Sequence, residues 1–212
     1  MRKIFFTFMT VLLATLAAQA ATNYNINVGG VEVTTSNYNN VTGGDIESGT
    51  VTYNESTNTL TLTNVTIRRT SGSSNFALHN RNCGKLIVVL VGDNYLYSKD
   101  GPAIKLNSGT GMTLRSEGGN NTIYSLNNDA VFAQSNSNWH FYVHGSGHVD
   151  IKSGKTYGMR SDAACNCILG NLSSQSSSPI YIDIYGPKGA INWQHQVSLN
   201  NSNYITLKKT GN

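Results

Sequence analysis

The sequence has little charge and little proline. Charged residues make up 12% of its 212 residues, against about 25% in an average soluble protein, and only 3 residues are proline. A disordered chain would combine high net charge with few apolar residues. This chain is 39% hydrophobic with a formal net charge of +4, so we expect it to fold. Abundant Gly, Asn, Thr and Val favour an all-β protein over a helical bundle.

Long apolar runs are also scarce, and the one that is present lies at the N-terminus. Residues 4–17 are mostly apolar, follow two basic residues and lead to Ala18-Gln19-Ala20, the pattern of a signal peptide cleaved near Ala20/Ala21. We therefore expect residues 1–20 to be a signal peptide and the mature protein to be extracytoplasmic: periplasmic, secreted or on the cell surface. No other run is long enough to cross a membrane as a helix, which predicts no membrane span.

Clusters of basic residues are small. Cleavage of the signal peptide would remove Arg2 and Lys3, which lowers the formal net charge from +4 to +2. The largest clusters that remain are the pairs Arg68-Arg69 and Lys208-Lys209. Nucleic acids and anionic membrane surfaces are bound through clustered Lys and Arg. We therefore expect no nucleic-acid partner.

The body of the chain repeats about every 27 residues. A first set of segments places a small residue before a large apolar one, and these small residues are Ala77, Ala103, Ala130, Gly158 and Ala190. A second set of alternating segments is in phase with the first: Val65–Ile67, Tyr95–Tyr97, Thr122–Tyr124, Val149–Ile151 and Ile182–Ile184. A third set comprises Leu60–Leu62, Leu86–Val88, Met112–Leu114 and Phe141–Val143, with Tyr204–Leu207 as a candidate last member.

Three short strands per repeat predict a single-stranded right-handed parallel β-helix, a solenoid in which each repeat forms one coil. An antiparallel sandwich also has short alternating strands, but it does not predict recurrence of the same small residue. Residues 21–58 break the period and are expected to form N-terminal cap strands, because a bare solenoid end exposes unpaired backbone. The parallel β-helix then spans residues 59–212. The residues expected to point inward are Leu96, Ile123, Val149, Ile151, Ile182 and Ile184.

The start of this cap carries a resemblance to a known group of proteins. Residues 24–34 read Tyr-x-Ile-x-Val-Gly-Gly-Val-x-Val-Thr, and Gly-Thr-Val-Thr-Tyr (49–53) and Asn-Thr-Leu-Thr-Leu-Thr-Asn-Val-Thr-Ile (58–67) follow. The chain resembles the largely uncharacterised β-helix modules, often labelled carbohydrate-binding-domain proteins, of secreted and surface proteins of gut Bacteroidetes. The resemblance implies an extracytoplasmic, non-enzymatic protein. Its motifs are structural, so no functional residue is carried over.

Cysteine and histidine give no clear metal site. The chain has 3 Cys, so at least one is unpaired. Cys83 and Cys165 lie about three coils apart, roughly 14 Å, which is too far for a disulfide. His140 and His144 alternate with apolar residues as in a strand, where four residues span about 13 Å, so they cannot share an ion. We expect solvent-facing histidines, although His144 and His148 flank a Gly-Ser-Gly turn and could approach.

The most informative feature for function is a pair of outward-facing columns on the second set of strands. One column contains Arg68, Tyr97, Tyr124, Lys152 and Tyr185, and its neighbour contains Thr66, Tyr95, Thr122, Asp150 and Asp183. Aromatic rings cover the apolar face of a sugar, and adjacent polar groups bond its hydroxyls. We name the candidate ligand-binding residues the outer strip: Tyr95, Tyr97, Tyr124, Asp150, Lys152, Asp183 and Tyr185. The alternative is that the Tyr contacts only stabilise the sheet.

Carboxylates are scarce as well, with 11 Asp and Glu in total. Asp150 and Asp183 would lie about 5 Å apart on adjacent coils, a separation that suits a retaining glycosidase. No other acidic residue joins them at a convincing spacing, and Glu55, Asp100, Asp129 and Asp162 read as turn formers.

These patterns predict a secreted, non-catalytic β-helix that binds a polysaccharide or other glycan. A structural or adhesive surface protein that recognises a protein partner or itself is the alternative, and a polysaccharide lyase or hydrolase is the third reading. No cofactor is indicated, although a Ca²⁺ ion held by backbone carbonyls would leave no pattern in the sequence.

Overall fold

The computed structural model describes residues 20–71, 75–107, 109–134, 140–162, 166–171, 179–193, 196–200 and 204–209, so the expected signal peptide, apart from Ala20, and Cys165 lie outside the described residues. The described chain is all-β, as predicted, and contains no helix that could span a membrane. Its strands are β1 (Asn23–Val28), β2 (Val31–Thr34), β3 (Ile46–Asn54), β4 (Thr59–Arg69), β5 (Leu78–Asn80), β6 (Lys85–Val91), β7 (Asn94–Ser98), β8 (Ile104–Leu106), β9 (Gly111–Ser125), β10 (Val131–Ala133), β11 (His140–Ser153), β12 (Tyr157–Ser161), β13 (Asn166–Leu169), β14 (Ile180–Gly186), β15 (Gly189–Asn192), β16 (Val197–Leu199) and β17 (Tyr204–Lys209).

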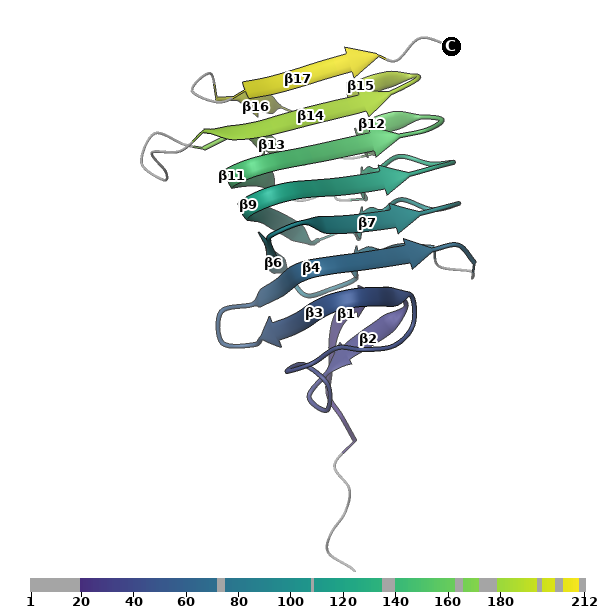
Figure 1. Cartoon of the computed structure of the whole chain (residues 1–212), viewed down its shortest axis with the longest axis vertical. Coiled ribbons are helices and arrows are strands. Elements are labelled where there is room, and N and C mark those ends of the chain that lie inside the picture. Colours follow the sequence, from purple (N-terminus) through teal and green to yellow (C-terminus); the bar gives the residue numbers. More distant parts are fainter. Residues whose placement is uncertain are drawn as a thin grey trace, which may run out of the picture.

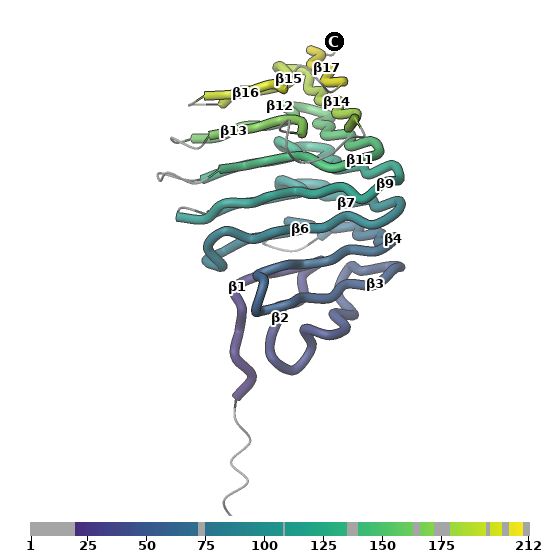
Figure 2. Tube along the Cα trace, turned by 90° about the vertical axis from the view of Figure 1, so that its left-hand side faces the viewer, coloured from purple at the N-terminus to yellow at the C-terminus, as the bar shows by residue number. Residues whose placement is uncertain are grey.

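From β4 onward the chain winds as a β-solenoid with about 28 residues between successive coils, which confirms the predicted fold class. The first ladder of parallel strands is β5, β8, β10, β12 and β15. The long strands β4, β9 and β11 turn a corner and take part in two further ladders. One of these includes β6, β13 and β16, and the other includes β7, β14 and β17. The ladder with β7, β14 and β17 faces the viewer in Figure 1, and Figure 2 shows the successive coils.

The last strand belongs to a different ladder from the one predicted. Tyr204–Leu207 was expected to continue the ladder of Leu60–Leu62, but Tyr204 pairs with Tyr181 and Ile205 with Ile182, so β17 follows β14. The ladder of Leu60–Leu62 is continued by β13 and β16 instead. These two strands are only four and three residues long, so their alternation is too brief to stand out in the sequence.

The core is a set of apolar columns with one residue per coil. In one column, Ile67, Leu96, Ile123, Ile151 and Ile184 are in register through β4, β7, β9, β11 and β14. Each is at most 1% exposed. The prediction that six residues point inward is confirmed, because all of them are buried: Leu96, Ile123, Val149, Ile151, Ile182 and Ile184.

Small residues are buried at the start of the first-ladder strands, as the repeat predicts. Ala77, Ala103 and Ala130 are fully buried, and Ala190 is 9% exposed. At Gly158, an added Cβ would lie 2.5 Å from Cγ2 of Ile184. This coil therefore has no room even for the methyl group of alanine.

Glycines stack at the corner between the two halves of the long strands. Gly92, Gly119 and Gly147 have φ angles of +69°, +73° and +81°, which L-residues with a Cβ rarely adopt. A Cβ on Gly119 would lie 2.2 Å from the carbonyl oxygen of Gly92, and one on Gly147 would lie 2.6 Å from that of Gly119. Close contact between coils therefore requires glycine at this corner.

A ladder of buried asparagines runs beside these glycines. Asn94 accepts a hydrogen bond from the backbone N–H of Val65 (2.9 Å) and donates one to Oδ1 of Asn121 (2.8 Å). Asn121 donates in turn to Oγ of Ser116 (3.1 Å). Asn94 and Asn121 are at most 3% exposed. The side chains thus bond backbone groups that the corner removes from the strand ladders.

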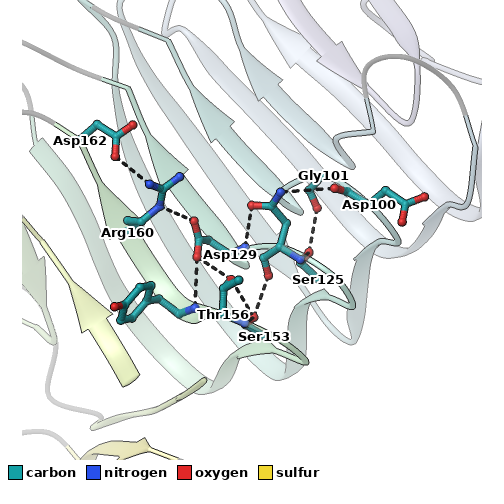
Figure 3. A network of polar contacts seen from close by, with 10 residues as sticks. Asp100, Gly101, Ser125, Asp129, Ser153, Thr156, Arg160 and Asp162 are labelled. Carbon is teal, nitrogen blue, oxygen red and sulfur yellow. Dashed lines mark hydrogen bonds and ion pairs between the residues drawn. The ribbon is translucent and has the colours of Figure 1, made fainter. Parts of the chain in front are cut away.

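The opposite corner is held by serine hydroxyls and one buried carboxylate (Figure 3). Ser125 donates to the carbonyl of Gly101 (2.8 Å) and Ser153 to that of Asn128 (2.7 Å), each in the preceding coil. Asp129, 2% exposed, accepts from Thr156 Oγ1 (2.6 Å) and from Nε of Arg160 (2.5 Å). Asp129 therefore fixes a turn, in agreement with its predicted role.

The first strands run against the direction of the coils. β1 is antiparallel to β5, and β3 is antiparallel to β4. Figure 1 shows β1, β2 and β3 together at the end of the stack opposite the label C. Parallel stacking therefore begins at β4, and antiparallel strands cover its first coil on two sides.

Replacement of an inward column residue should be costly. We expect Ile123→Ala to lower the free energy of unfolding by about 2–5 kcal/mol, because it opens a cavity between Leu96 and Ile151. Thr122→Ala, on the same strand but facing outward, should change it by less than about 0.5 kcal/mol. Urea denaturation followed by circular dichroism measures both, and an equal cost for the two variants would contradict the register.

Candidate functional site

The structure brings the outer strip together in the two predicted columns. Tyr97, Tyr124, Lys152 and Tyr185 are consecutive in register, and Lys208 follows them. The neighbouring column is Tyr95, Thr122, Asp150, Asp183 and Thr206. All seven strip residues are half-buried, because each side chain is partly covered by its neighbours in the stack.

The tyrosine rings of the outer strip contact one another and nearby cations. Tyr95 and Tyr97 are parallel within 6° with centroids 6.2 Å apart, and Tyr124 is tilted by 46° at 5.7 Å from Tyr97. The guanidinium carbon of Arg68 lies 4.9 Å from the Tyr95 centroid, over the ring. Among the described contacts of the strip, cations lie over Tyr95 and Tyr185 but not over Tyr97 or Tyr124.

Tyr185 has a different environment. The Nζ atoms of Lys152 and Lys208 lie 5.5 Å and 5.8 Å from its ring centroid. Burial raises the pKa of Tyr185, and the negative charges of Asp183 and Asp150 raise it further. The phenol therefore stays protonated at neutral pH, and its hydroxyl donates a hydrogen bond to Asp183.

Asp150 and Asp183 meet at a charged cluster that contains one residue the sequence reasoning missed. Nε2 of His148 lies 2.8 Å from Oδ2 of Asp183 and 3.6 Å from Oδ1 of Asp150. Lys152 donates from Nζ to Oδ2 of Asp150 at 2.5 Å. The two carboxylates face each other across neighbouring strands, where like charges repel, and the imidazole and the ammonium lie where they can offset that repulsion.

The sequence analysis considered only acidic residues as partners of the aspartate pair and expected His148 to face solvent, so it missed this contact. The position of His148 two residues before Asp150 places it on the same face of β11, since side chains alternate along a strand. The two-residue spacing of His148 and Asp150 was therefore a sequence signal for this contact. The Gly-Ser-Gly sequence before His148 obscured that signal, because it suggested a turn. β11 instead continues through these residues as a strand with a register shift.

His140 and His144, both on β11, are not part of this cluster. His140 is exposed, whereas His144 is half-buried and stacks on Tyr142 with centroids 4.5 Å apart. Burial lowers the pKa of His144, and the nearby charge of Arg115 lowers it further.

Cys83 is a free thiol whose Sγ lies 2.9 Å from Oδ1 of Asn58.

The cluster has consequences for both metal binding and acid–base chemistry. His148, Asp150 and Asp183 offer ligand atoms that all lie within 4.8 Å of one another, a group that could hold a divalent ion. Burial raises the pKa of Asp183, but hydrogen bonds from Thr206 and His148 outweigh it, so the pKa is lowered overall. A glycosidase general acid needs a raised pKa, which Asp183 does not have.

Comparison with known proteins adds no assignment. A scan against protein-family models, a search of curated proteins and a search of solved structures each returned no match. Function must therefore be argued from the chemistry of the chain itself.

Asp183 should contribute to acid sensitivity. Because its folded-state pKa is lowered, its stabilising effect is complete above the unfolded-state value of about 3.9 and is lost as the pH falls through the folded-state pKa. We expect the free energy of unfolding of Asp183→Asn to decline less than that of the wild type below about pH 4. Urea denaturation at a series of pH values from 6 downward measures this difference, and parallel pH profiles would contradict it.

Proposed function

We propose that the protein is an exported, non-catalytic glycan-binding β-helix that binds polysaccharide through the outer strip. It would then be similar in role to the carbohydrate-binding-domain modules of gut Bacteroidetes. One observation carries the proposal: tyrosines and hydrogen-bonding charged groups stand in register on one continuous face. A repeat of about 4.8 Å between coils is close to the length of one sugar residue in an extended chain.

The chemistry along the strip suits a hydroxyl-rich ligand. Tyr97 and Tyr124 supply apolar ring surface for the C–H face of a pyranose. Asp150, Asp183 and Lys152 supply acceptors and donors that can bond hydroxyl groups on either side of such a ring. The residues stand on strands rather than on loops, so little ordering is required when a ligand binds.

Non-catalytic binding is favoured over glycoside hydrolysis by the state of the aspartate pair. Asp183 has a lowered pKa and accepts a hydrogen bond from His148, while Asp150 is paired with Lys152. A hydrolase would need one of the two carboxyls to be protonated near neutral pH. Release of soluble products that Asp150→Asn abolishes would overturn this part of the proposal.

Removal of the ring surface should abolish binding. We expect the triple variant Tyr97→Ala, Tyr124→Ala and Tyr185→Ala to lose at least tenfold in affinity for a polysaccharide that the wild type binds, because ring stacking is lost at three coils. Affinity electrophoresis on a panel of plant, host and bacterial polysaccharides, with and without Ca²⁺, measures it.

The matched control is Phe132→Ala, which removes an outward aromatic ring from the first ladder and should leave binding unchanged. Circular dichroism should show that all variants are folded. A folded triple variant that binds as well as the wild type would contradict the proposal.

A second candidate function is recognition of a protein partner. The exposed large hydrophobic residues among the described strands gather mainly on β14, β16 and β17: Tyr181, Leu199, Tyr204 and Leu207, each 42–60% exposed. Exposed apolar patches often mark interaction sites. Concentration-dependent association in sedimentation velocity, lost in Leu207→Lys and seen without glycan affinity, would favour this function over the first.

A further inference from the structure

A groove at the first coil is lined by three tyrosines from three different segments. Tyr24 belongs to β1, Tyr38 to the connection between β2 and β3, and Tyr53 to the end of β3. The volume of the groove is about 710 Å³, within the range of about 300–1,000 Å³ that is typical of small-ligand sites. The repeat pattern did not indicate this groove, because its walls come from segments that are far apart in the chain.

The aromatic wall of this groove is held in place by the cap strands. The ring of Tyr24 lies 4.8 Å from that of Tyr53 and 6.5 Å from that of Tyr38, centroid to centroid. Tyr53 is 5% exposed and donates from its hydroxyl to Oδ1 of Asn58 at 2.9 Å. Tyr24 and Tyr38 are half-buried, so each presents part of its ring to the groove.

The rest of the lining is polar and almost uncharged. Amide and hydroxyl groups line it, among them those of Asn39, Thr52 and Thr61. Glu55 is the single charged side chain among its described lining residues. Oε2 of Glu55 accepts a hydrogen bond from the hydroxyl of Tyr24 at 3.0 Å. The groove therefore combines aromatic surface with many neutral donors and acceptors and one carboxylate.

We propose that this groove, the cap groove, is a second saccharide-binding site that takes a short, uncharged oligosaccharide. Ring faces match the apolar side of sugars, while the hydroxyl, amide and carboxylate groups match sugar hydroxyls. An anionic ligand would meet Glu55 and no described cation in the lining. The inference extends the proposed glycan-binding function, but its residues are separate from those of the outer strip.

The two sites lie on different sides of the coil. The cap groove reaches β4 at Thr59 and Thr61, in the half of the strand that pairs with β6, whereas Arg68, beside Tyr97, lies in the half that pairs with β7. The strand turns a corner between these halves, so the seven steps from Thr61 to Arg68 span at most about 23 Å. A long polysaccharide could contact both sites, whereas a short oligosaccharide would occupy them separately.

The experiment titrates the purified protein with neutral hexasaccharides derived from cellulose, xylan, mannan, starch and chitin, by isothermal calorimetry. The blocking variant is Thr52→Arg, which places a long side chain in the groove from an exposed position. Its matched control is Thr50→Arg, on the same face of β3 two residues away and outside the groove lining. Tyr38→Ala tests the ring surface directly, and its folding is checked by circular dichroism.

We expect at least one hexasaccharide to bind at two sites. Thr52→Arg and Tyr38→Ala should each reduce the stoichiometry from two to one or weaken one site at least tenfold, and Thr50→Arg should retain both sites. The outer-strip triple variant should keep the site that Thr52→Arg removes.

Three results would overturn the inference in distinguishable ways. If Thr52→Arg leaves hexasaccharide binding unchanged while the triple variant loses it, the cap groove is not a saccharide site and the proposed function stands. If choline chloride binds, Thr52→Arg blocks it and no hexasaccharide competes with it, the tyrosines form a cage for a quaternary ammonium group instead of a saccharide site. If no hexasaccharide binds the wild type, both the inference and the neutral-glycan form of the proposed function fail.

Discussion

The structure depends on one constraint, which is that equivalent residues of successive coils stand directly above one another. Parallel hydrogen bonding between strands fixes this register, and every inward or outward position is therefore repeated at the same place on each coil. The constraint explains why the core is a set of columns rather than a single cluster. It also explains why the corners have so little freedom. At Gly119, even one methyl group would strike the carbonyl oxygen of Gly92 in the preceding coil.

The same constraint builds the surface. A residue type that faces outward on one strand is brought beside its equivalent on the next, so tyrosines become a strip and aspartates become a pair. Stacked like charges are unfavourable, and the chain places His148 and Lys152 beside Asp150 and Asp183 where they can offset that cost. The side chains that would bind a ligand therefore also stabilise the sheet. Most strip residues contact a neighbouring ring or a group of opposite charge.

Much of this arrangement could be predicted from the sequence, because period and alternation determine register. The columns through Tyr97, Tyr124, Lys152 and Tyr185 follow from counting alternate residues in each repeat, and the structure has the same order. The missed features have physical reasons. β16 has too few residues to show a period. The cap groove joins Tyr24, Tyr38 and Tyr53 through antiparallel contacts that no repeat encodes.

The outer strip and the cap groove both combine tyrosine rings with hydrogen-bonding groups, although the strip carries Asp150, Lys152 and Asp183 whereas the groove has Glu55 as its one charged lining residue. This common chemistry leads to the central claim that the outward face of the coils binds glycan.

The most direct test is a titration of the isotope-labelled protein with a bound polysaccharide fragment, followed by backbone amide NMR. The account predicts shift changes concentrated at Tyr95–Tyr97, Thr122–Tyr124, Asp150–Lys152 and Asp183–Tyr185. Shift changes confined to the first ladder, or none at saturating glycan, would contradict it.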